Sequence, residues 1–324
     1  PQPFRGDQVA AGVVVLATLV LLVDLRFAGT WSQGARLLVT GLAAAFVGTM
    51  AALSTLESER PRGYQTVLYV STCLLTLLAL ARLAHVLGSS DAAARGTVAW
   101  ELLALGLLAL AFSLGRNSAY CTLIATAAFT VALVCGVTWI FDAHGADTVR
   151  WLLLVAVLAD LFGAVLLRDR RRAHAVMLVD AAGLTVLALG FTFLFGEFAL
   201  SGGLGDATRP AAMPWGWALV IVVAGGSLVA YAGADRERGP GYLGVLNLVL
   251  FAVLAAQGEA TLLGWPLVLA VVAGVFLVLG LRPTHPLPPE PDGEERIEPR
   301  AIPLPRDRDE APTAVRDPAD PDEL

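Results

Sequence analysis

Ten apolar stretches occupy the chain between Val9 and Leu281, and each is long enough, or nearly long enough, to cross a lipid bilayer. A membrane-spanning helix needs about 20 predominantly apolar residues. The stretches are rich in leucine and alanine and are too long for strands, which favours helices. The sequence therefore predicts an all-α fold, a polytopic transmembrane helical bundle of about ten spans.

The predicted spans divide the chain into a short N-terminal segment (1–8), a transmembrane helical domain (9–281) and a C-terminal tail (282–324). The ninth span is the shortest, and it could instead pair with the tenth as a re-entrant hairpin that turns at Gln257–Glu259. The spans are Val9–Leu25, Leu37–Ser54, Val67–Leu87, Val98–Leu114, Tyr120–Phe141, Trp151–Leu167, Ala175–Leu200, Trp215–Ala234, Tyr242–Ala256 and Thr261–Leu281.

Arginines near the predicted helix ends indicate the orientation. With the N-terminus inside, ten arginines before the tail fall in inner segments and five fall in outer segments. Cytoplasmic loops carry the excess of basic residues, which predicts both termini in the cytoplasm. All seven tryptophans map to the opposite side. The chain contains arginine but no lysine, as is typical of proteins from GC-rich genomes. We therefore expect a bacterial protein. Its spans predict a multi-pass protein of the cytoplasmic membrane, in contact with the membrane lipids.

The composition changes abruptly in the tail. Residues 282–324 hold 11 of the 18 prolines and 12 of the 28 acidic residues of the chain. Such a segment cannot bury a hydrophobic core, so we predict a disordered, acidic, proline-rich cytoplasmic tail. It could recruit a cytoplasmic protein partner with a basic surface, although a tail that is merely solvated is the commoner case.

The composition also excludes several kinds of chemistry. Without lysine there is neither a Walker A lysine nor a lysine Schiff base. The four histidines do not pair at one depth as a transmembrane haem requires, and no zinc-binding spacing of cysteine or histidine occurs. We therefore expect no cofactor, no metal site and no nucleic-acid partner, and we favour a protein without enzymatic activity.

Charged residues inside spans are rare and are by default functional candidates. Asp160 and Asp180 lie on consecutive antiparallel spans, each roughly 8–10 Å from the cytoplasmic boundary at 1.5 Å per residue, and each has a glycine three residues later. If the two carboxylates face each other in a medium of low dielectric constant, they favour sharing a proton, as a proton-coupled carrier requires. Alternatively, the arginines of the Arg168–Arg172 loop fold back and neutralise both acids, which is the structural interpretation we favour.

A second group of charged residues lies near the outer ends of the third and fourth spans. Arg82 and Glu101 have matching depths, and His85 shares the helix face of Arg82. We expect a buried Arg82–Glu101 bridge between the two helices, with an anion site on Arg82 as the less favoured alternative. Asp24 and Arg36 are expected to form a structural pair at the first outer turn.

Two functions remain open from the sequence. The favoured one is a non-catalytic accessory or scaffold component of the membrane, because unbroken spans are unusual in carriers. The alternative is a small-solute or proton-coupled transporter that uses Asp160 and Asp180. A carrier needs a polar, water-reachable cavity that touches these aspartates, whereas a scaffold needs dry, bridged packing.

Overall fold

The computed structural model describes residues 6–54, 61–89, 94–143, 145–201 and 213–257, without the side chains of 195–201 and 257. The chain divides into two units, Pro1–Ala273 and Gly274–Leu324, and every described residue belongs to the first. The tenth predicted span and the tail, with its suggested protein partner, lie outside the described residues.

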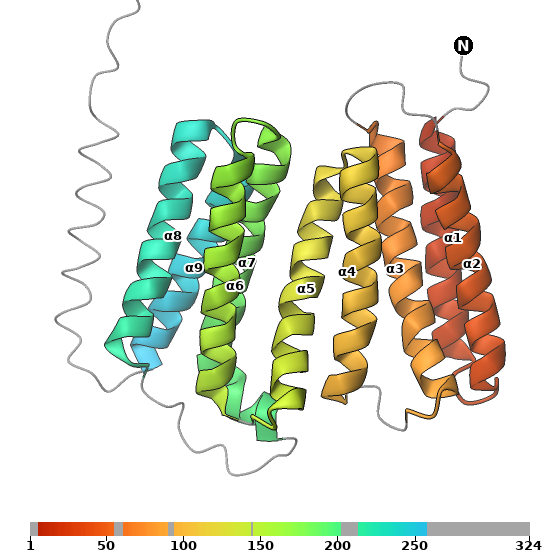
Figure 1. The fold of residues 1–324 in the computed structure, drawn as a ribbon, viewed down its shortest axis with the longest axis horizontal. Coiled ribbons are helices and arrows are strands. Elements are labelled where there is room, and N and C mark those ends of the chain that lie inside the picture. The colour runs from red at the N-terminus through yellow and green to blue at the C-terminus, as the bar shows by residue number, and fades with distance from the viewer. Residues whose placement is uncertain (1–5, 55–60, 90–93, 144, 202–212, 258–324) are drawn as a thin grey trace, which may run out of the picture. The chain divides into compact units, whose positions relative to one another are not determined.

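The described part of the chain is entirely helical apart from turns, as the sequence predicts (Figure 1). Its helices are α1 (Gly6–Arg26), α2 (Gln33–Leu53), α3 (Gly63–Val86), α4 (Arg95–Arg116), α5 (Ala119–Ile140), α6 (Ala146–Leu167), α7 (Arg172–Ser201), α8 (Trp215–Asp235) and α9 (Arg238–Gln257). Within this part, all nine are long and apolar enough to cross a membrane. The protein is therefore a multi-pass membrane protein with a helical bundle.

The helices extend past the predicted apolar spans because polar residues at the membrane surface continue the same helical turns. The clearest case is the ninth span, predicted as the short segment Tyr242–Ala256, which is a 20-residue helix. Its first turn is Arg238–Gly241. The charged arginine and the glycines lower the mean hydropathy of this turn, so the span predicted from hydropathy begins after it. The full length of α9 removes the reason for treating it as half of a re-entrant hairpin.

Local signals set several helix ends. The Ser32 hydroxyl accepts a hydrogen bond from the backbone N–H of Ala35 and caps the start of α2. Asn117, with φ of 52°, ends α4 in the left-handed conformation, and Gly88, with φ of 97°, follows α3. At the end of α2, the Arg116 guanidinium donates to the carbonyl oxygens of Ser54 and Ala52, which satisfies acceptors that a helix leaves unpaired.

Consecutive helices pack as antiparallel hairpins, α2 with α3, α4 with α5, α6 with α7 and α8 with α9 (Figure 1). One apolar core forms mainly between α1, α2 and α3, around Val47 and Tyr69. Another forms between α6, α7, α8 and α9, around Leu189, Ile221 and Phe251. Helix α4 packs against α3, and α5 packs against α4 and α7, so α4 and α5 connect the two groups. Helix α5 packs less extensively against α6 than against α7.

The described tryptophans all lie toward one end of the bundle, the end opposite the α6–α7 turn that carries the arginines. They are Trp31, Trp100, Trp139, Trp151, Trp215 and Trp217. Trp217 packs against Trp151 and Phe193, with ring centroids 5.1 and 6.3 Å away. Indole rings favour the membrane–water interface, so this end marks one membrane surface, which the arginine counts predict to be the outer one.

Candidate functional site

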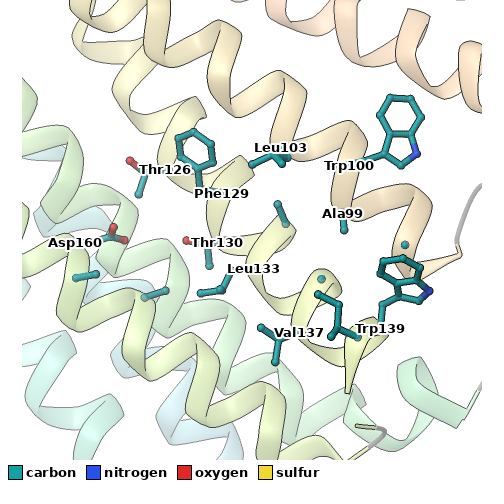
Figure 2. A pocket seen from close by; sticks show the side chains of 16 residues that line it. Ala99, Trp100, Leu103, Thr126, Phe129, Thr130, Leu133, Val137, Trp139 and Asp160 are labelled. Carbon is teal, nitrogen blue, oxygen red and sulfur yellow. The ribbon is translucent and has the colours of Figure 1, made fainter. Parts of the chain in front are cut away.

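A cavity of about 760 Å³ lies where α4 and α5 meet α6, between the two groups of helices (Figure 2). Its walls are mostly apolar, with Leu103, Phe129 and Leu133 among them, so it differs from the polar cavity that the sequence argument requires of a carrier. Leu103 and Leu133 are 49% and 41% exposed, so the cavity opens on a face of the bundle that carries apolar side chains. A ligand cavity of this size and composition suits a small, largely apolar molecule.

Asp160 of α6 is the only charged residue among the described ones that line this cavity, which we call the Asp160 cavity. The residue is 7% exposed, and its Oδ2 atom is buried. Within the described chain, no hydrogen-bond donor reaches Oδ2 and no ion pair includes this carboxylate. Figure 2 shows the carboxylate at the same end of the cavity as Thr126 and Thr130, with Trp100 and Trp139 at the other end.

The cavity runs along the helices. Asp160 lies seven residues before Leu167 and Thr126 lies seven after Ala119, which places both about 10 Å from the predicted cytoplasmic ends of α6 and α5 at 1.5 Å per residue. Trp139 is in the last turn of α5 and Trp100 is in the second turn of α4, both toward the opposite, predicted outer ends. The carboxylate is thus the deep end of the cavity, and the indoles are close to the predicted outer surface.

The predicted clamp between the Arg168–Arg172 loop and the two aspartates is wrong. Arg168 lies 3.7 Å from the Asp235 carboxylate and Arg172 lies 3.8 Å from that of Glu237. Arg172 also donates to the Asp235 carbonyl oxygen at 3.1 Å. The Arg168 and Arg172 side chains are 65% and 58% exposed. They pair with acids at the α8–α9 turn, which they reach at the surface without entering the apolar layer.

The two aspartates do not form a pair either. Asp180 faces the first turn of α9, where a Cβ atom built on Gly239 would lie 2.8 Å from Oδ2 and 3.0 Å from Oδ1. Asp160 faces the cavity beside α5 instead. The carboxylate of Asp180 therefore lies beside the first turn of α9, away from the Asp160 cavity.

Arg82 binds an acid other than the one predicted. Its Nη2 atom lies 2.6 Å from Asp24 Oδ2, and Arg36 contacts the same carboxylate through Nε at 2.8 Å and Nη2 at 2.9 Å. Asp24, Arg36 and Arg82, which we call the Asp24 triad, join α1, α2 and α3. The expected Arg82–Glu101 bridge is wrong because α3 presents Arg82 to α1, while the predicted Asp24–Arg36 pair is confirmed.

Glu101 and His85 interact electrostatically, but neither bonds Arg82 among the described contacts. Glu101 is 6% exposed, and no donor from the described residues reaches its Oε1 atom. His85 is partly buried and its Nδ1 atom lies 3.1 Å from the Ser89 carbonyl oxygen. Glu101 is absent from the lining of the Asp160 cavity, although its neighbour Trp100 is part of it. These residues therefore do not add a second charge to that cavity.

A buried polar network lies near the predicted cytoplasmic ends of α4, α5 and α7. His174 contacts Asn117 Oδ1 through Nε2 at 2.8 Å and Thr122 Oγ1 through Nδ1 at 2.6 Å. Ser113 Oγ lies 2.8 Å from the Thr122 hydroxyl. This arrangement fits an imidazole that donates from Nε2 and accepts at Nδ1, an assignment made from the hydrogen-bond partners. The network ties α7 to the α4–α5 hairpin.

Replacing His174 by leucine is expected to destabilise the protein by about 1–3 kcal/mol, because the buried Thr122 hydroxyl and the partly buried Asn117 side chain lose this partner. The free energy of unfolding in mixed micelles, measured by titration with sodium dodecyl sulfate, checks this. Thr49→Val is the control, since the exposed Thr49 hydroxyl bonds only its own helix in the described structure. Equal losses in the two variants would show that the network adds no stability.

Sequence reasoning identified Asp160 but missed its surroundings. Thr126 and Thr130 are four residues apart on α5, and Thr126 lies at the depth of Asp160, so matching depths across α5 and α6 would have found this threonine. The aromatic end, Trp100 and Trp139, was noted only as evidence for orientation. Among the described residues, no group of three or more histidine, cysteine or acidic side chains is placed to hold a metal ion.

Comparisons with known proteins add no relative. No family model, no curated protein and no solved structure matches the chain. The functional argument therefore rests on the site itself.

Proposed function

We propose that the protein is a carrier that binds a small solute at Asp160. The observation that carries this proposal is the buried Asp160 carboxylate, which faces a cavity and has no partner within the described chain. A charge inside the membrane costs several kcal/mol, and intramembrane acids usually mark a substrate or ion pathway. Two of the arginines expected to neutralise it, Arg168 and Arg172, bind other acids.

Two other buried acids do not support the same role. Asp180 and Glu101 also have oxygen atoms without a donor among the described residues, but neither lines the Asp160 cavity. Asp180 lies against the start of α9, and Glu101 is buried on α4. The combination of an unpartnered carboxylate, adjacent hydroxyl groups and an open cavity distinguishes Asp160.

The accessory or scaffold function is the second candidate, and the Asp24 triad favours it. This cluster is dry and bridged, with Asp24 and Arg36 only 3% and 4% exposed. The helices also run without a break at Gly136 and Gly225-Gly226, glycines that could have interrupted a carrier helix. These features stabilise the bundle, but they leave the Asp160 cavity without a role.

Uptake into proteoliposomes tests the carrier proposal. Three radiolabelled probes of different charge are used: 1-methyl-4-phenylpyridinium, biphenyl-4-carboxylate and glycerol. We expect faster uptake of at least one probe than in protein-free liposomes, and loss of that increase in Asp160→Asn. Asp147→Asn is the matched control, because the Asp147 side chain is 79% exposed on the same helix. Uptake of all three probes at the protein-free rate would contradict the proposal.

A further inference from the structure

We propose that the solute bound in the Asp160 cavity is a lipophilic organic monocation, such as an aryl or alkyl ammonium or pyridinium ion. This inference rests on the proposed function, since it names the class of solute for the same site. It follows from three properties of the cavity: the sign of its charge, the nature of its walls and the position of its aromatic residues.

The charge of the cavity favours a cation. Asp160 is the only ionisable residue among its described lining residues, and no arginine or histidine is among them. An ionised Asp160 gives the walls a charge of one negative unit, which an organic monocation neutralises. An anion would meet like charge in a medium of low dielectric constant, where the repulsion is poorly screened.

The walls favour a cation with a large apolar part. Apart from Asp160 and the hydroxyl groups of Thr126 and Thr130, the side chains that line the cavity are aliphatic or aromatic. Small hydrated cations would lose their water shell without replacement ligands, because metal ions such as Mg²⁺ and Ca²⁺ require several oxygen ligands. An aryl or alkyl group gains instead from contact with the apolar walls.

Aromatic residues provide a second favourable contact for such a cation. Trp100 and Trp139 lie at the end of the cavity nearest the predicted outer surface, and Phe129 lines it between them and Asp160 (Figure 2). Ring faces attract organic cations, and indole does so most strongly. A lipophilic cation that enters from the outer half of the bilayer would therefore meet indole rings first and the carboxylate at the deep end.

Equilibrium dialysis with the full chain in lipid nanodiscs tests the inference. The probe is 1-methyl-4-phenylpyridinium, and biphenyl-4-carboxylate has a similar shape and the opposite charge. Empty nanodiscs give the lipid background. We expect saturable binding of the cation, no saturable binding of the anion, and at least tenfold weaker cation binding in Asp160→Asn with unchanged binding in Asp147→Asn. Competition by 4-methylbiphenyl, the neutral isostere of the cation, should be weak.

A second variant keeps the test decisive if Asp160→Asn does not fold. Leu133→Trp places a larger side chain in the cavity from a position that is 41% exposed, so the bundle can accept it. We expect this variant to lose cation binding while its unfolding free energy stays near that of the wild type. Cation binding unchanged in Leu133→Trp would place the cation elsewhere and overturn the inference.

The outcomes for the inference and for the proposed function are separable. Saturable, Asp160-dependent cation binding without uptake of any probe would support the cation site and overturn the carrier function. Asp160-dependent uptake of the anion or of glycerol, without cation binding, would support the carrier and overturn the cation site. Equal binding of the cation and the anion would overturn the inference whatever the uptake shows.

Discussion

Replacing Asp24 by alanine is expected to lower the free energy of unfolding by about 3–5 kcal/mol, the usual cost of removing one partner from a buried ion pair. Arg36 and Arg82 both depend on this carboxylate, and the side chains of Arg36 and Asp24 are 5% and 2% exposed. The substitution leaves two guanidinium groups at the junction of α1, α2 and α3 without their acid. Titration with sodium dodecyl sulfate in mixed micelles gives the measurement.

The control for Asp24→Ala is Asp147→Ala. Asp147 is also bridged to an arginine, with 2.7 Å between its Oδ1 atom and Arg150 Nη1, but its side chain is 79% exposed. Exposed ion pairs contribute about 0–1 kcal/mol. If Asp24→Ala costs no more than Asp147→Ala, the Asp24 triad does not hold α1, α2 and α3 together.

The second large effect is expected for Gly244→Ala on α9. A Cβ atom at Gly244 would lie 2.8 Å from the Gly225 carbonyl oxygen and 2.9 Å from the Val229 backbone nitrogen. These are backbone atoms of α8 and cannot rotate away, so the two helices must separate. Overpacking of this kind costs about 1–3 kcal/mol. Close approach of helix backbones at small residues is a main source of helix association in membranes.

Gly233→Ala provides the comparison, because Gly233 lies on α8 and has open space around its Cα atom. Alanine is favoured over glycine inside a helix by about 1 kcal/mol, so this variant should be neutral or more stable. The same micelle titration distinguishes the two positions. Similar stabilities of Gly244→Ala and Gly233→Ala would mean that α8 and α9 separate at no cost.

Sequence reasoning was most reliable for properties that depend on position along one helix. Hydropathy and length predicted each described span to within a few residues, since any crossing must satisfy the bilayer. Depth in the membrane stays a prediction, obtained from residue count times helical rise. Asp24 and Arg36 were paired correctly, since only a short turn separates their helices and few other partners are within reach.

The lateral arrangement of the helices could not be predicted from the sequence. Arg82 and Glu101 have matching depths, yet α3 turns Arg82 toward Asp24 on α1. Asp160 and Asp180 also match in depth, but one faces the cavity beside α5 and the other faces α9. Spans that are apolar on nearly every face carry little information about which face meets which neighbour. The choice is made by close packing of side chains, with glycines such as Gly244 setting the distance between helices.

The sequence by itself thus determined that the chain crosses the membrane many times and where each described crossing lies, because the bilayer acts on every helix separately. Only the tertiary structure decided which acids meet arginines and that Asp160 faces a cavity instead. Packing between helices determines this arrangement. Because lipid and protein interior are equally apolar, burial does not favour one helix pairing over another, and the contacts that each helix face makes determine its neighbour.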